Sequence, residues 1–109
     1  DLSEPEPDLM LLKPRADFYA EAHPSAADVL LLIEVADSSA RYDREIKLPL
    51  YARHGVPEVW IVDLEARLLR LNREPVGDAY GQVSTTASPG RTPIAALPGV
   101  EIELAQILG

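Results

Sequence analysis

The sequence predicts a single α/β domain built on two parallel strands joined by a helix. Residues 29–33 are an apolar run too short for a comfortable helix, and turn-forming residues follow within a few positions. Residues 59–62 form a second apolar run, rich in β-branched and aromatic side chains, that ends in an aspartate. A helical pattern lies between the two runs. Strand, helix and strand in this order form a crossover unit, which places the strands parallel and the helix over one face.

One more strand is predicted before this unit. Residues 1–7 are polar and rich in proline, as in a linker or a frayed end. Residues 9–12 are a short apolar run stopped by a Lys-Pro pair, which indicates a strand. Residues 17–22 are compatible with a short helix, and Ser25 is suited to cap a further helical turn before Asp28. This segment joins two strands that can lie antiparallel.

The helix of the crossover unit has clear ends and one irregular point. Asp43 is suited to cap its start, and Gly55, followed closely by a proline, ends it. Pro49 removes one backbone donor inside the helix, so the helix either kinks there or begins its regular part nearby. Lys47 lies next to this irregularity, and a local change in helix geometry can direct its side chain. The apolar residues predicted on the buried face are Ile46, Leu50 and Tyr51.

Strand signals continue after the crossover unit and become weaker toward the C-terminus. Residues 64–67 are a turn, and residues 68–73 alternate as in a half-exposed strand that forms a hairpin with the preceding one. Residues 80–86 are typical of an outer strand. Beyond them, scattered apolar residues between positions 94 and 102 are compatible with a short strand, and residues 102–108 fit either a strand or a helical turn. The pattern therefore predicts a weakly structured tail.

Composition excludes several classes of protein. The chain has no cysteine, which rules out disulfides, thiolate metal sites and a cysteine nucleophile. No apolar run approaches the length of a membrane span and no signal peptide is visible, so we expect a soluble cytoplasmic protein. A formal net charge of −8 argues against a simple electrostatic nucleic-acid binder. It leaves open an enzyme that meets phosphates through a metal ion held by carboxylates.

Three charged residues lie where the predicted elements begin or end: Asp8, Glu34 and Lys47. If residues 9–12 pair antiparallel with residues 29–33, the two carboxylates come together, which is unfavourable unless a cation or a proton intervenes. Mg²⁺ binds such carboxylates together with waters and phosphate oxygens of a substrate. Lys47, from the helix, can place its ammonium over the same point and offset charge at phosphorus. These residues therefore indicate a metal-dependent site for phosphate chemistry.

A structural role for the same residues is the alternative. Asp8 would then only begin a strand, and Glu34 and Lys47 would only form an ion pair. Glu34 favours the functional interpretation, because a carboxylate that interrupts an apolar run resuming at Val35 is costly unless it is paired or binds a metal.

Four strings of residues resemble one family of nucleases. They are PDL at 7–9, IEVADSS at 33–39, YDREIKLPLY at 42–51 and GVPEVWIVD at 55–63. Together they resemble the Uma-type putative restriction endonuclease family, which belongs to the PD-(D/E)XK nuclease superfamily. The resemblance covers residues 7–73, and the combination of the last two strings is far more specific than a lone pair of carboxylates.

The resemblance implies a restriction-endonuclease-like fold, which is a mixed β-sheet flanked by helices, and a metal-dependent phosphodiesterase site. Asp8 and Glu34 would be metal ligands, and the carbonyl of Val35 would be a third ligand. Lys47 would be the catalytic lysine. The metal ion would be Mg²⁺ or Mn²⁺, and the substrate would be DNA.

The chain departs from the family pattern in two ways. The usual lysine of the superfamily lies two residues after the acid, where this chain has Ala36, so the assignment depends on Lys47 acting from the helix. The resemblance also implies an N-terminal portion, with a helix and further strands, that this chain lacks. We therefore expect residues 1–109 to form a single, partial, C-terminal nuclease-like domain.

The leading hypothesis is a metal-dependent DNA endonuclease that hydrolyses phosphodiester bonds. The alternative is a catalytically inactive module that keeps the nuclease fold for dimerisation or partner binding. We also expect a homodimer, because both faces of the strand at 59–62 are apolar and the chain supplies only one convincing long helix. A second copy, or the N-terminal portion, would cover the other face.

Overall fold

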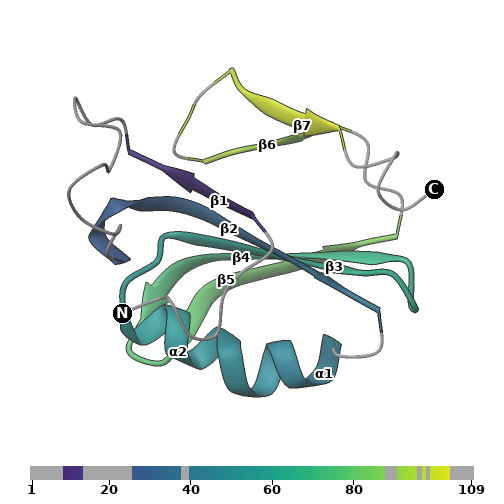
Figure 1. The fold of residues 1–109 in the computed structure, drawn as a ribbon, viewed down its shortest axis with the longest axis horizontal. Coiled ribbons are helices and arrows are strands. Elements are labelled where there is room, and N and C mark those ends of the chain that lie inside the picture. The colour runs from purple at the N-terminus through teal and green to yellow at the C-terminus, as the bar shows by residue number, and fades with distance from the viewer. Residues whose placement is uncertain are drawn as a thin grey trace.

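A mixed five-stranded sheet with one helical segment forms the body of the molecule (Figure 1). The computed structural model describes residues 9–13, 26–37, 40–87, 91–95, 97 and 99–103. The strands are β1 (Leu9–Leu12), β2 (Val29–Ala36), β3 (Glu58–Asp63), β4 (Leu68–Val76), β5 (Ala79–Thr86), β6 (Arg91–Pro93) and β7 (Glu101–Glu103). The main sheet has the order β1-β2-β3-β4-β5, and a second sheet pairs β6 with β7. The architecture is α/β with a predominance of strands, and the predicted fold class is confirmed.

Strand pairing follows the predicted crossover unit. β2 and β3 run parallel, with Glu34 opposite Ile61 in register. β1 pairs antiparallel with β2, and a short 3-10 helix, η1 (Ala26–Asp28), leads into β2. β3, β4 and β5 form two successive antiparallel hairpins. The parallel pair, the antiparallel first strand and the hairpin after β3 are therefore confirmed.

The helical segment changes type along its length. α1 (Ala40–Tyr42) is α-helical, η2 (Asp43–Lys47) is a π-helix and α2 (Leu48–Arg53) is α-helical again. Pro49 lies in the first turn of α2, and its missing N–H removes one bond that a continuous α-helix would make. The regular part of the helix thus begins next to the proline, as predicted. No helix in the described part of the chain is long and apolar enough to cross a membrane.

Two details of the predicted helix are wrong. The helix begins at Ala40, so Asp43 lies inside it and does not cap it. Ile46 is 55% exposed, although the helical pattern predicted it on the buried face with Tyr51. The i→i+5 bonding of the π-helix explains the difference, because it changes the angular spacing of side chains that an α-helical pattern assumes.

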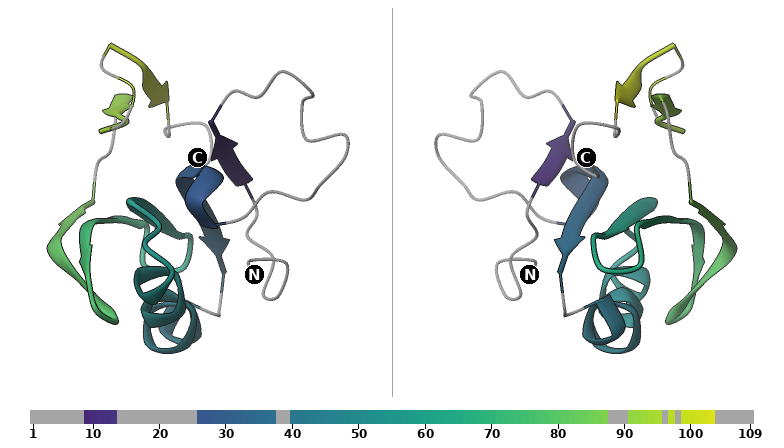
Figure 2. Two further views of the ribbon diagram at one scale, coloured as in Figure 1. Left: turned by 90° about the vertical axis from the view of Figure 1, so that its left-hand side faces the viewer. Right: turned by 90° about the vertical axis from the view of Figure 1, so that its right-hand side faces the viewer.

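The helical segment packs on one face of the sheet and closes the first hydrophobic core (Figure 2). Buried side chains from β2, β3 and α2 meet there, among them Leu32, Val59, Ile61, Tyr51 and Ala52. Tyr80 from β5 joins this core, and its hydroxyl donates to the Val56 carbonyl over 2.7 Å. Burial raises the pKa of the Tyr80 phenol, so this hydroxyl stays a neutral donor. The bond ties β5 to the loop that follows the helix.

The opposite face of the sheet carries a second hydrophobic core. Its buried members are Leu31, Ile33, Trp60, Val62, Leu69 and Ile94. Leu97 and Ile102 pack against it from the hairpin of β6 and β7, which lies across the sheet from the helix (Figures 1 and 2). The C-terminal tail thus covers the face for which we expected a second copy or an N-terminal portion, and Trp60 is fully buried within one chain. The prediction of a weakly structured tail is wrong for this hairpin.

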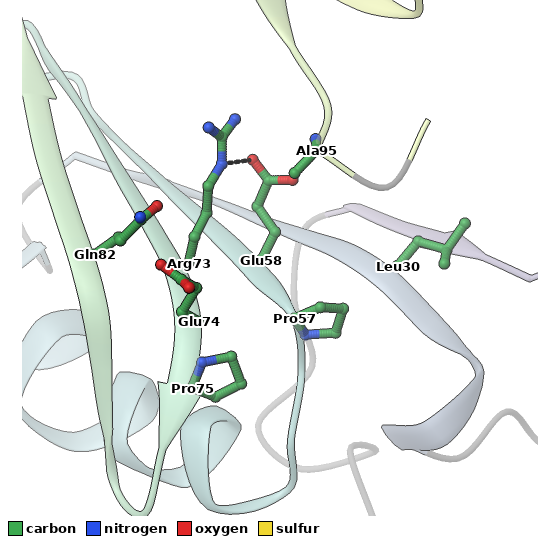
Figure 3. A pocket seen from close by; sticks show the side chains of 8 residues that line it. All are labelled: Leu30, Pro57, Glu58, Arg73, Glu74, Pro75, Gln82 and Ala95. Atoms are coloured by element: carbon green, nitrogen blue, oxygen red, sulfur yellow. Dashed lines mark hydrogen bonds and ion pairs between the residues drawn. The ribbon is translucent and has the colours of Figure 1, made fainter. Parts of the chain in front are cut away.

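A buried carboxylate fastens this hairpin to the sheet (Figure 3). Glu58, the first residue of β3, is 1% exposed and lines a hollow of about 330 Å³. Trp60 Nε1 and Arg73 Nε each donate to Glu58 Oε2 over 2.7 Å, and the Ala95 amide donates to Oε1 over 3.0 Å. Arg73 also donates to the Pro93 carbonyl over 2.9 Å. These bonds join β3 and β4 to the chain around the end of β6.

Replacing Glu58 by alanine is expected to lower the free energy of unfolding by about 3 kcal/mol, because the buried indole of Trp60 and the partly buried guanidinium of Arg73 lose their acceptor. Urea denaturation followed by the fluorescence of Trp60, the single tryptophan of the chain, measures the change. Glu65→Ala is the matched control, since Glu65 is exposed in the turn between β3 and β4. Equal stability of the two variants would show that Glu58 does not hold the hairpin in place.

Candidate active site

β2 buries a carboxylate, Glu34, in the middle of an apolar strand. Its neighbours along the strand, Ile33 and Val35, are apolar, and Glu34 itself is only 2% exposed. Side chains alternate along a strand, so Glu34 lies on the same face as its register partner Ile61, which is the face that the helix covers. A buried charge of this kind is unfavourable unless other groups compensate it.

The helical segment supplies two compensating groups. Lys47 places its Nζ 3.2 Å from Glu34 Oε2, and the Tyr51 hydroxyl donates to the same oxygen over 2.8 Å. Lys47 and Tyr51 are about one helical turn apart, so their side chains leave the same side of the helix. The Lys47 side chain is 17% exposed and the Glu34 side chain 3%, so water screens the attraction between the two charges only weakly.

The π-helix sets the position of Lys47. Lys47 is the last residue of η2 and directly precedes α2, in which Pro49 is the second residue. Single π turns within helices are frequent at functional sites, where they redirect side chains. The irregularity that the sequence predicts beside Lys47 is therefore present, at the point from which the ammonium reaches β2.

The structure describes three of the four predicted site residues. Glu34 and Lys47 are in contact, and Val35 follows Glu34 on β2. Asp8 lies outside the described residues. The first residue of β1 pairs with Ile33, so β1 begins opposite the end of β2 that carries Glu34, as predicted. The roles of Asp8 and of the Val35 carbonyl as metal ligands stay predictions.

The described residues do not by themselves form a complete metal centre. Among them, no three or more His, Cys, Asp or Glu side chains gather closely enough to hold a metal ion. Glu34 contributes carboxylate oxygens, which are the donor type that Mg²⁺ and Mn²⁺ prefer. A metal ion at this place would therefore need further oxygen ligands beside Glu34.

Sequence reasoning missed Tyr51 as a member of this group of residues. We predicted it only as part of the buried helix face. A buried tyrosine hydroxyl usually has a hydrogen-bond partner, which distinguishes tyrosine from phenylalanine at such a position. The signal in the sequence is thus a tyrosine one turn after the candidate lysine, on the face that packs against a strand containing a glutamate.

The sequence also matches a known protein family over nearly its full length. The Uma2 family model, described as "Putative restriction endonuclease", matches residues 1–105. No curated protein matches the chain. The family match extends beyond residues 7–73, which carry the resemblance found in the sequence, and includes the β6–β7 hairpin.

Tyr51→Phe is expected to lower the free energy of unfolding by about 1.5–3 kcal/mol, because it removes a hydrogen bond to a buried carboxylate. Urea denaturation measures the loss. Tyr42→Phe serves as the control, since Tyr42 is exposed on α1 and loses the same hydroxyl. If the two variants are equally stable, the bond from Tyr51 to Glu34 contributes nothing to the fold.

Proposed function

Because the chain belongs to the Uma2 family of putative restriction endonucleases, we propose that it hydrolyses phosphodiester bonds of DNA with the help of a divalent metal ion. The observation that carries this proposal is the buried Glu34 carboxylate with the Lys47 ammonium beside it. Sites of phosphate chemistry use carboxylates to hold a metal ion and cationic side chains to neutralise developing charge. Both kinds of group meet here on the helix side of the sheet.

Asp8, Glu34 and the Val35 carbonyl are the groups that would hold the metal ion. All three offer oxygen atoms, which suit Mg²⁺ or Mn²⁺. The Glu34 side chain is already oriented, because Lys47 and Tyr51 both contact its Oε2. When bound, the cation polarises the phosphate and acidifies a water molecule.

Lys47 and Tyr51 prepare the site for this chemistry. Lys47 carries a positive charge in a little-exposed position, where its attraction for the negative charge that develops on the phosphate is strong. Tyr51 is a positioning residue, because its hydroxyl holds the Glu34 carboxylate in one orientation. In this proposal the helix, and not β2, supplies the catalytic lysine.

An inactive module with a nuclease fold is the second candidate. The ion pair between Lys47 and Glu34 compensates both charges, so a purely structural pair accounts for the same contact. Association with a partner, or with a second copy, would then be the retained function. The two candidates differ in whether loss of either charge changes the rate of DNA cleavage.

We further propose that the protein forms a homodimer through β5. β5 is a terminal strand of the main sheet, and its sequence contains no charged residue and no proline. Natural edge strands usually carry such residues, which prevent pairing with other chains. Val83, within this strand, is 60% exposed. Two copies related by a two-fold axis can pair their β5 edges antiparallel without bringing like charges together.

Nicking of a supercoiled plasmid by the full-length protein tests the enzymatic proposal. In Mg²⁺ or Mn²⁺, Glu34→Gln and Lys47→Ala are each expected to lower the rate by about 100-fold or more, because each removes a charge from the reacting centre. Arg53→Ala is the control, since Arg53 is exposed in the last turn of α2. Thermal melting verifies that each variant is folded. Equal rates in all proteins would refute the site assignment, and a wild type without activity would favour the inactive module.

Light scattering at micromolar concentration tests the dimer. The wild type is expected to have the mass of two chains, and Val83→Lys the mass of one, because a lysine on an edge strand opposes pairing with another chain. Ile46→Lys is the control, since it replaces a comparably exposed apolar residue on the helix and should leave the dimer intact. A monomeric wild type, or a dimer unaffected by Val83→Lys, contradicts this part of the proposal.

A further inference from the structure

Two arginines have buried atoms that lack hydrogen-bond partners. The Nε atoms of Arg44 and Arg70 are buried and make no hydrogen bond within the described part of the chain. Other arginines are matched, since Arg73 pairs with Glu58 and Arg41 with Glu45. The sequence has 18 acidic and 10 basic residues, so acidic partners are plentiful. The lack of an acceptor for these two Nε atoms is therefore a property of their positions and not of the composition.

Such atoms destabilise the folded state. A buried donor on a charged group loses its bonds to water, and this loss is not recovered unless another acceptor takes the place of water. Two arginines in this condition, one on a helix and one on a strand, suggest an acceptor from outside the chain. A guanidinium presents paired, planar donors that fit the oxygens of a phosphate group.

The fold brings both arginines to the side of the sheet that carries the candidate active site. Arg70 is the register partner of Ile61, which is also the partner of Glu34, so the three side chains lie on one face across adjacent strands. Arg44 belongs to η2 together with Lys47. Arg44 is partly buried as a residue, and its Nε atom is fully buried.

We infer that Arg44 and Arg70 bind a backbone phosphate of the DNA, next to the phosphate that reacts at Glu34 and Lys47. This inference rests on the proposed endonuclease function and adds the residues that hold the substrate. It also accounts for the approach of an acidic protein to DNA. The net charge is −8, so counterions of the DNA backbone would be replaced locally, by the guanidinium groups of Arg44 and Arg70.

Fluorescence anisotropy of a labelled DNA duplex tests the inference, with Ca²⁺ in place of Mg²⁺ and again in EDTA. Arg44→Gln and Arg70→Gln are each expected to raise the Kd by about tenfold and to reduce the slope of log K against log salt by about 1. Arg53→Gln, at an exposed position of α2, should change neither quantity. Variants that bind DNA as tightly as the wild type, or a wild type that does not bind DNA, would overturn the inference.

Stability gives a second measurement that needs no DNA. Arg44→Met and Arg70→Met are expected to keep or raise the melting temperature, because each removes a buried donor that has no acceptor. Inorganic phosphate should raise the melting temperature of the wild type more than that of either variant. A lower melting temperature in both variants, with an unchanged response to phosphate, would show that the arginines serve the fold alone.

The outcomes separate this inference from the proposed function. A wild type that binds DNA through Arg44 and Arg70 without nicking it supports the inference and refutes the enzymatic proposal. A wild type that nicks DNA, with both glutamine variants binding normally, supports the enzyme and refutes the inference.

Discussion

The burial of Glu34 is the constraint on which the helix side of this molecule depends. A charge inside a strand must be compensated by groups that reach it from another element. Lys47 and Tyr51 both do so, and this fixes where the helix lies over the sheet and which of its sides points inward. The π-helix accommodates the arrangement, because it ends at Lys47 immediately before the turn that contains Pro49.

A second buried glutamate in the same protein shows what a structural carboxylate looks like. Glu58 is bound by Arg73 and Trp60, and its other oxygen accepts a backbone amide, so the whole group serves to attach one hairpin. Glu34 has a lysine that keeps some exposure, and the same face of the sheet carries an arginine, Arg70, with an unmatched donor. This contrast supports a ligand-binding role for the first glutamate and a structural role for the second.

The order of strands and the contact between Glu34 and Lys47 were predictable because they depend on local signals. Short apolar runs bounded by turns give the strands, and the crossover brings the helix over the acid. The exposure of Ile46 was not predictable, because an α-helical period does not hold through a π turn. The hydrogen bond from Tyr51 to Glu34 was not predictable either, because it depends on which residue of the sheet lies opposite the helix. Ile94 packs on the sheet from a segment whose apolar residues have no regular spacing, so hydrophobic periodicity does not predict its burial.

The strands of the main sheet lie side by side in the order in which they occur along the chain. Each strand pairs with the one synthesised before it, so no strand has to enter between two that are already paired. Every pairing in the main sheet consequently joins consecutive strands, so the sheet can assemble strand by strand as the chain is synthesised. The β6–β7 hairpin follows, and its capture by Glu58 closes the core around Trp60. The topology therefore makes the enclosure of the tryptophan depend on the last-synthesised part of the described chain.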